Sequence, residues 1–188
     1  HAAYHHGEIS LQKAITGMAQ EFMGSNNIAL LMPNGQFGTR LEGGKDSASP
    51  RYIFTQLNSI TKIIFNEYDK CILNYLEDDG SKIEPDFYAP IIPTILVNGA
   101  EGIGTGFSSK ILCYNPIDVM NYLRCILRKQ KMRPELKPYY EGFKGTITKI
   151  GDYKWCFKGK YEIIDDITVH ISDLPVGVWT NDFKLNLE

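Results

Sequence analysis

The sequence predicts an α+β protein, and three of its features carry that prediction. Residues 9–23 and 116–129 have apolar side chains at helical spacing. Residues 143–171 instead alternate short β-prone runs with tight turns, which is typical of hairpins. Two glycine-rich runs, residues 36–52 and 98–106, stand apart from both patterns. We therefore expect helices and short antiparallel strands joined by loops of high glycine content.

The composition is that of an ordinary globular protein. Of 188 residues, 43% are hydrophobic, and the formal net charge is −2. Because general polyanion binding rests on clustered Lys and Arg, any phosphate contact must be local. No run approaches the roughly 20 apolar residues of a membrane span, and no signal-peptide pattern opens the chain. The four cysteines form no CxxC pair, so neither a zinc site nor a disulfide framework is predicted.

The first elements follow from local signals. The helix predicted over residues 9–23 has one buried stripe and ends at the polar run from Gly24 to Asn27. The β-branched and aromatic residues from Arg51 to Leu57 favour a strand. A helix from Ser59 to Phe65 follows, and Asn58 is its expected N-cap.

The middle of the chain is expected to be mostly irregular. Residues 66–90 mix acidic and aromatic side chains, which predicts a solvated, partly packed connection. The acidic cluster Glu77–Asp79 within it is expected to be a solvated turn. Residues 90–97 are apolar at odd and even positions alike and include prolines, so a buried extended segment is predicted. In the run from Gly99 to Gly106, four of eight residues are glycine, which lets a loop approach a ligand closely.

The sequence pattern changes near Ile111, and a second domain is predicted to begin there. Asn115 and Pro116 open a helix that runs to about Lys129. Four strands are then expected: Phe143 to Ile150, Lys154 to Phe157, Tyr161 to Ile164 and Ile167 to Ile171. The predicted domains are residues 1–109 and 110–188. Because the chain opens on His1 rather than Met, we also expect it to be part of a longer protein.

The candidate chemistry lies at the end of the first glycine-rich run. A phenol, with a usual pKa of about 10, is a poor nucleophile at neutral pH. An arginine beside it is, however, well suited to hold a phosphate. Arg51 and Tyr52 form such a pair, which can attack a phosphodiester. Taken alone, one of eleven tyrosines is more often a packing residue. The residues before Tyr52, from Ser49 to Arg51 and the glycines upstream, favour a catalytic role instead.

Seven strings, in order, make the chain similar to type IIA DNA topoisomerases of the eukaryotic kind. The strings are residues 3–8, 24–27, 36–40, 43–55, 98–106, 143–147 and 173–180. The resemblance implies a DNA breakage-reunion region, with a winged-helix (CAP-like) domain followed by part of a mixed α/β tower domain. Phe107 stands where a tryptophan is common, and Gln56 and Asn58 also depart from common animal sequences. These departures suggest a divergent lineage such as a large DNA virus.

The resemblance also implies roles for single residues. Tyr52 would attack DNA and form a transient 5′-phosphotyrosine link, and religation would then need no fresh energy source. Arg51 would meet the charge of the transition state, and His6 would hold the scissile phosphate. Ile103 would wedge between base pairs and bend the duplex, at a stacking cost of a few kcal/mol. Further DNA-binding residues are expected to be Arg40, Lys45, His5, Gln36 and Ser49.

The same resemblance implies what this chain lacks. Mg²⁺ and ATP would be bound by parts of the full-length protein outside this chain, so no metal ligands are nominated here. The full-length enzyme would be an ATP-hydrolysing, intracellular homodimer acting on double-stranded DNA, in the nucleus or, if viral, in the host cytoplasm. This fragment alone is expected to be inactive.

Other functions remain open at this stage. Tyr52 could be structural in a winged-helix module that bends DNA without cutting it. Tyrosine recombinases and single-strand topoisomerases also use a tyrosine nucleophile, but they gather several Arg and His side chains around it, a pattern not visible here. A second basic region contains Arg124, Arg128, Lys129, Lys131 and Arg133. A solvated helix end is its default interpretation, and a contact with a DNA arm is the alternative.

Overall fold

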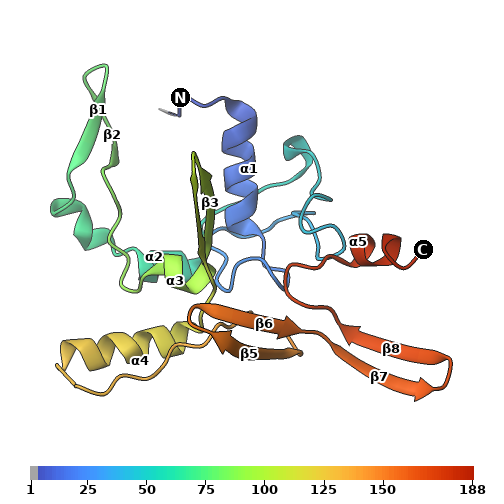
Figure 1. The fold of residues 1–188 in the computed structure, drawn as a ribbon. Helices are drawn as coiled ribbons and strands as arrows, with labels where there is room; N and C mark the ends of the chain where they lie inside the picture. Colours follow the sequence, from blue (N-terminus) through green and yellow to red (C-terminus); the bar gives the residue numbers. More distant parts are fainter. Residues whose placement is uncertain (1–3) are drawn as a thin grey trace.

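The computed structural model describes residues 4–188, which form short helices and two-stranded antiparallel sheets (Figure 1). Ala3, which opens the first string of the resemblance, lies outside the described residues. The first half contains α1 (Glu8–Ala19), η1 (Pro50–Tyr52), α2 (Ser59–Ile64), η2 (Glu67–Cys71), β1 (Tyr75–Asp78), β2 (Ser81–Pro85), α3 (Thr94–Asn98), β3 (Ala100–Gly104) and β4 (Phe107–Ile111). The second half contains α4 (Pro116–Leu127), β5 (Thr146–Gly151), β6 (Lys154–Lys158), β7 (Lys160–Asp165), β8 (Thr168–Asp173) and α5 (Thr180–Leu185). The predicted α+β class is confirmed.

The helix predicted over residues 9–23 forms, but it ends earlier, at Ala19. Gln20 leaves the helical region with ψ 132°. The Asn26 side chain folds back, and its Nδ2 donates to the carbonyls of Gly17 at 2.7 Å and Gln20 at 2.8 Å. Carbonyls at a helix end lack intrahelical partners, so this amide fixes the end of α1.

The strand predicted from Arg51 to Leu57 is wrong in its first half. Pro50 instead starts the 3₁₀ turn η1, since a proline with its fixed φ suits the first position of a helical turn. Phe54 and Leu57 make only isolated antiparallel bridges, to Asn34 and Leu31. The helix expected next is confirmed as α2, and the Asn58 side chain caps it by accepting from the Ile60 amide.

The solvated connection predicted over residues 66–90 contains regular structure. η2 begins after Asn66, whose side chain accepts from the Tyr68 amide at 3.0 Å. β1 and β2 then pair through a turn at Asp79 and Gly80, where φ is 48° and 76°. An Asp-Gly pair is a strong hairpin signal because both residues tolerate positive φ. The turn predicted at the acidic cluster is therefore present, and it closes a hairpin that the sequence analysis did not predict.

Two more predictions of the first half are corrected. The apolar segment over residues 90–97 ends in the short helix α3, which buries Val97 at 1% exposure. An apolar run on both parities fits a buried helix as well as a buried strand. The second glycine-rich run is a hairpin, β3 with β4, and Gly106 supplies the positive φ of 79° in its turn.

The second half contains the predicted helix and four strands, and in addition the helix α5, which was not predicted. α4 begins at Pro116, and Asn115 Oδ1 accepts from the Ile117 amide at 2.8 Å. β5 pairs with β6 and β7 pairs with β8, each antiparallel. Gly159 joins the two hairpins, and a Cβ there would overlap the Asp173 carbonyl oxygen. Glycine therefore permits the close approach at this junction.

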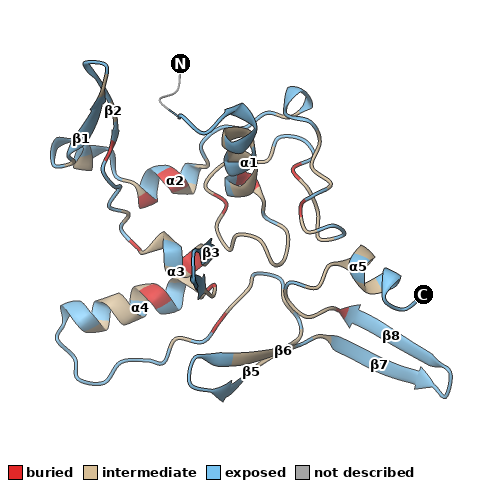
Figure 2. Ribbon diagram, turned by 45° about the horizontal axis from the view of Figure 1, so that its top comes forward, coloured by how far each residue is buried: buried red, intermediate tan, exposed pale blue. Residues whose placement is uncertain are grey.

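The core is small, and its buried residues are distributed over α1, α2, α3, α4 and the loops between them (Figure 2). Its apolar members are Ala19, Ala29, Phe37, Ile64, Ile92, Val97, Cys113 and Val119. The hairpins lie at the periphery and are largely exposed in the same view. Helices α3 and α4, which lie on opposite sides of the predicted domain boundary, contact each other.

Candidate functional site

Tyr52 is presented to solvent from a short turn. The Tyr52 amide donates to the Ser49 carbonyl at 2.9 Å, and the Ile53 amide donates to the Pro50 carbonyl at 3.4 Å. The side chain of Tyr52 is not packed, since the residue is 70% exposed. The Arg51 guanidinium lies 5.8 Å from the centroid of the Tyr52 ring. The structure thus places a cation beside an accessible phenol, as the sequence predicts.

The loop that leads to Tyr52 is braced by its own hydrogen bonds. Asp46 accepts from the Thr39 amide at 2.8 Å and from the Thr39 hydroxyl at 2.6 Å. These bonds hold the pKa of the Asp46 carboxyl below its usual value, because they favour its charged form. The Ala48 amide donates to the Gln36 carbonyl at 2.9 Å and closes the loop at its base.

Glycines in this loop are required by close packing. Gly38 has φ 101°, and a Cβ there would lie 2.5 Å from the Gly44 Cα. Gly44 has φ 84°, and a Cβ there would overlap the side-chain amide of Gln20. That amide donates to the Phe37 carbonyl at 2.8 Å, which ties the loop to the end of α1. The glycine content therefore shapes the loop itself, besides any approach to a ligand.

A groove of about 580 Å³ runs between α1 and this loop. Lys45 and Ser49, both predicted to bind DNA, line its loop side. Gln12 and Lys13 line its helix side, and the sequence did not single them out. Pro50, the first residue of η1, also lines the groove. The arrangement offers cations and hydroxyl groups along a path toward the turn that carries Tyr52.

The two predicted histidines face different neighbours. His5 Nε2 lies 3.3 Å from Asp78 Oδ2, which draws His5 toward the β1–β2 hairpin. The His6 ring stacks edge to face with Tyr4, with 5.4 Å between centroids. Both histidines are exposed and immediately precede α1, the helix that borders the groove.

Arg40 is engaged within the chain. Its Nη1 forms an ion pair with Asp173 Oδ1, and its Nη2 donates to the Leu174 carbonyl at 2.7 Å. The Arg40 side chain is 25% exposed and that of Asp173 only 2%. The predicted DNA contact of Arg40 stays a prediction, and its guanidinium already has two acceptors inside the protein.

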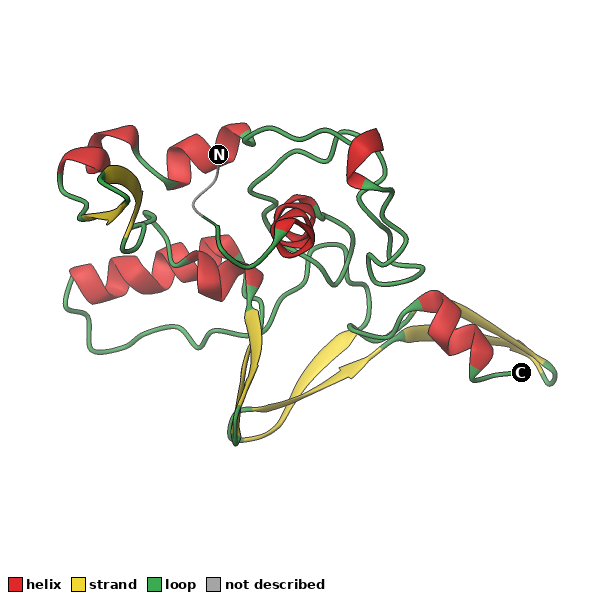
Figure 3. Ribbon diagram, turned by 90° about the horizontal axis from the view of Figure 1, so that it is seen from above, coloured by secondary structure: helices red, strands yellow, loops and turns green. Residues whose placement is uncertain are grey.

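Ile103 stands near the end of a slender projection. β3 and β4 extend away from the body of the molecule (Figure 3), and Ile103 pairs with Ser108. Ile103 is 90% exposed and Phe107 is 86% exposed. Because side chains alternate along a strand, these two leave opposite faces of the hairpin. Large apolar side chains at an exposed tip are typical of a surface that meets a partner.

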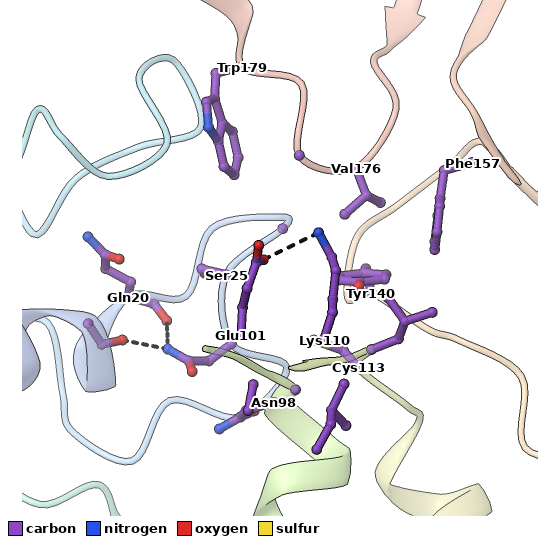
Figure 4. Close-up of a pocket in the computed structure, with 18 residues that line it drawn as sticks. Gln20, Ser25, Asn98, Glu101, Lys110, Cys113, Tyr140, Phe157, Val176 and Trp179 are labelled. Carbon is purple, nitrogen blue, oxygen red and sulfur yellow. Dashed lines mark hydrogen bonds and ion pairs between the residues drawn. The ribbon is translucent and has the colours of Figure 1, made fainter. Parts of the chain in front are cut away.

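A second cavity, of about 430 Å³, lies at the base of this projection (Figure 4). Glu101 and Lys110, which are paired on neighbouring strands, line it and form an ion pair of 3.3 Å, and Trp179 lines it from the C-terminal segment. Burial raises the pKa of the Cys113 thiol and raises the pKa of Tyr140 to about 12. Both groups are therefore uncharged at neutral pH.

Sequence reasoning missed the partners that hold the loop in place. Gln20, Asp46, Asp173 and Trp179 each contact the glycine-rich run or its immediate neighbours. Asp173 and Trp179 do belong to the seventh string of the resemblance, which was the available signal. Among residues 4–188, no group of three or more His, Cys, Asp and Glu side chains could hold a metal ion. No helix in that range is long and apolar enough to cross a membrane.

Comparison with known proteins places these features in one family. The family model that describes the A subunit of DNA gyrase/topoisomerase IV matches residues 1–188, and the chain belongs to that family. The protein named DNA topoisomerase 2 of Arabidopsis thaliana is 54% identical over 97% of the chain, and its namesake from Acanthamoeba polyphaga mimivirus is 52% identical over 98%. The chain spans only 13% and 15% of these relatives.

A solved structure agrees with the sequence comparison. The crystal structure of the Plasmodium falciparum topoisomerase II DNA-binding, cleavage and re-ligation domain matches with a TM-score of 0.96. It is 52% identical, and the match covers all of this chain and 25% of that one. The resemblance to type IIA topoisomerases is therefore confirmed. The plant and viral relatives have nearly equal identity, so they do not separate a viral from a cellular lineage.

Proposed function

We propose that the protein carrying this chain cuts and rejoins double-stranded DNA through Tyr52, as the cleavage and religation core of an ATP-dependent type IIA topoisomerase. The observation that carries the proposal is the exposed Tyr52 beside Arg51 at the end of a braced loop. Family membership over the whole chain supports it. A tyrosine that was needed only for packing would be buried among its neighbours.

The reaction is a transesterification. Tyr52 Oη bonds to the scissile phosphorus as its proton leaves, the bond from phosphorus to the 3′ oxygen breaks, and that oxygen takes up a proton. The product is a 5′-phosphotyrosine and a free 3′ hydroxyl, so one phosphodiester has replaced another. Religation is the reverse step. Arg51 and His6 would stabilise the charge that spreads over the phosphoryl oxygens in the transition state.

Other residues would place the duplex. Lys45 and Ser49 in the groove, Gln36 at the base of the loop and His5 ahead of α1 would contact the DNA backbone, which fixes register without reading sequence. Ile103 would insert between base pairs and bend the duplex. Unstacking costs a few kcal/mol and is offset by the contacts that a bent duplex allows.

The remaining parts of the activity belong to the longer protein. We place Mg²⁺ and ATP in segments outside this chain, as the similarity to type IIA topoisomerases implies. The full-length protein would be a homodimer acting in the nucleus, or in the host cytoplasm for a viral enzyme. Within this chain, residues 1–109 would form the winged-helix domain and residues 110–188 part of the tower domain.

The test replaces Tyr52 by phenylalanine in the full-length protein. Incubation with duplex DNA and Mg²⁺, followed by denaturation, is expected to yield covalent protein-DNA adducts from the wild type and none from Tyr52→Phe. Tyr153→Phe is the matched control, because Tyr153 is 99% exposed and lies in a distant turn. Adducts from Tyr52→Phe at the wild-type level would exclude Tyr52 as the nucleophile. DNA bending without adducts in the wild type would instead establish a non-catalytic binding module.

A further inference from the structure

We propose that Asp173 and Trp179 are positioning residues for Tyr52, which clamp the glycine-rich loop from the other end of the chain. The clamp has a polar contact at Arg40 and an apolar contact at Gly43. This inference rests on the proposed role of Tyr52. It assigns to Arg40 a function inside the protein in place of a DNA contact.

The polar half of the clamp is an ion pair between Arg40, whose side chain is partly exposed, and the buried Asp173. The Arg40 Nε is buried and has no hydrogen-bond partner. Asp173 Oδ1 pairs with Arg40, and Asp173 Oδ2 accepts from the Lys144 amide at 2.7 Å. The second Arg40 nitrogen donates to Leu174 at 2.7 Å. Both carboxylate oxygens and both terminal nitrogens are thus occupied. A charge held this way resists loosening, because separation would leave it buried and unpaired.

The apolar half of the clamp is the Trp179 ring. It covers Gly43 so closely that a Cβ on this glycine would overlap the indole. Phe22 packs edge to face with the same ring, with 5.9 Å between centroids. In Figure 4 the Trp179 side chain extends from the C-terminal segment toward the region of α1 and Gln20. Two further bonds, Asn181 amide to Leu41 carbonyl at 3.0 Å and Asn181 Nδ2 to Glu42 at 3.2 Å, flank this contact.

The clamped residues connect to Tyr52 through consecutive hydrogen bonds. Thr39, next to Arg40, donates twice to Asp46. Two residues further on, Ala48 is bonded to Gln36, and Ser49 then accepts from the Tyr52 amide. These hydrogen bonds hold the loop between the clamp and the turn that carries Tyr52. A shift of the clamp therefore moves Tyr52 relative to a bound phosphate.

Such a shift matters because attack on phosphorus depends on alignment. Misplacement of a reacting group by about 1 Å costs up to about 100-fold in rate. Binding of DNA, which depends on many separate contacts, is much less sensitive to one of them. Loss of the clamp should hence reduce the cleavage rate at saturating DNA while leaving affinity nearly unchanged.

The experiment uses the full-length protein with Asp173→Asn, Arg40→Ala and the double variant. Single-turnover cleavage at saturating DNA is expected to fall about 10- to 100-fold in each. The double variant should be no slower than the slower single variant, because both changes remove the same contact. Asp173→Glu, which keeps the carboxylate, should recover much of the rate. Glu135→Gln, which removes an exposed ion pair with Lys149, is the matched control and should leave the rate unchanged.

DNA affinity measured across a salt series separates the two roles of Arg40. A clamp predicts an unchanged affinity and salt slope for Arg40→Ala and Asp173→Asn alike. Weaker binding with a shallower slope in Arg40→Ala alone would make Arg40 a phosphate contact and overturn the inference. Normal cleavage by Asp173→Asn would also overturn it.

Two controls keep the result interpretable. If Asp173→Asn does not fold, Trp179→Phe tests the apolar half, and wild-type cleavage by that variant and by Arg40→Lys would contradict the clamp. Failure of the proposed function is recognised separately. In that case Tyr52→Phe still forms adducts, whatever the clamp variants do.

Discussion

Replacing Asn27 by alanine tests how the two halves of the chain are joined. Asn27 Nδ2 donates to the carbonyls of Val97 at 3.0 Å, Tyr114 at 3.2 Å and Tyr139 at 3.0 Å. Asn27 Oδ1 accepts from the Glu141 amide at 2.9 Å. One side chain therefore bonds to segments on both sides of the predicted boundary at residues 109 and 110.

The expected magnitude follows from these four contacts. Two amide hydrogens serve three carbonyls, so together with the accepted bond the side chain supplies three full hydrogen bonds. At a net value of about 1 kcal/mol each, Asn27→Ala should lower the free energy of unfolding by about 3 kcal/mol. Asn27→Asp should lower it further, because a carboxylate would face three carbonyl oxygens without a hydrogen to donate.

Urea unfolding provides the measurement, followed by tryptophan fluorescence and by far-ultraviolet circular dichroism. Trp155 and Trp179 both lie in the second half, whereas circular dichroism reports on helices of both halves. Asn121→Ala is the matched control, since Asn121 is exposed on α4, and it should change stability by less than about 0.5 kcal/mol. A loss in Asn27→Ala no larger than in this control would refute the reasoning.

Three other variants test separate features. The pKa of Asp46 is lowered from 3.8, so the stability that its charged form contributes is present above pH 3.8 and is lost as the pH falls through the lowered pKa. Asp46→Asn should remove this acid dependence of the free energy of unfolding. An unchanged dependence on pH would count against the bonds to Thr39. Because Cys113 is buried with a raised pKa, a thiol reagent should label exposed Cys71 first, and Cys71→Ser should abolish the fast phase. An unchanged fast phase in that variant would contradict the prediction. Ile103→Ala should reduce DNA bending more than it reduces DNA affinity, with bending measured by energy transfer between the duplex ends. Unchanged bending would show that Ile103 does not act as a wedge.

Local signals in the sequence predicted the elements that depend on near neighbours. α2 and α4 form where Asn58 and Asn115 can cap them, and each cap reaches only two residues ahead. The hairpins of the second half follow from alternating runs and turns. The turn predicted at Glu77–Asp79 is present as well, but the pairing of the strands on either side of it was not predicted.

Elements that depend on distant packing could not be predicted. α3 is helical because Val97 is buried against other segments, and its apolar sequence is equally compatible with a strand. The candidate site divides in the same way. Arg51 and Tyr52 are adjacent, so their pairing is visible in the sequence, whereas Arg40 and Asp173 are separated by 133 positions.

The clamp and the internal bonds of the loop differ in what would break them. Thr39 to Asp46 and Ala48 to Gln36 are bonds within the loop, so they persist when the second half moves. Separating Arg40 from Asp173 would leave the buried Asp173 carboxylate without its cation, at a cost of about 3 to 5 kcal/mol. The easier motion is therefore one in which loop and clamp travel together. Tyr52 would then move together with the second half of the chain, and its alignment with a phosphate would depend on the position of that half.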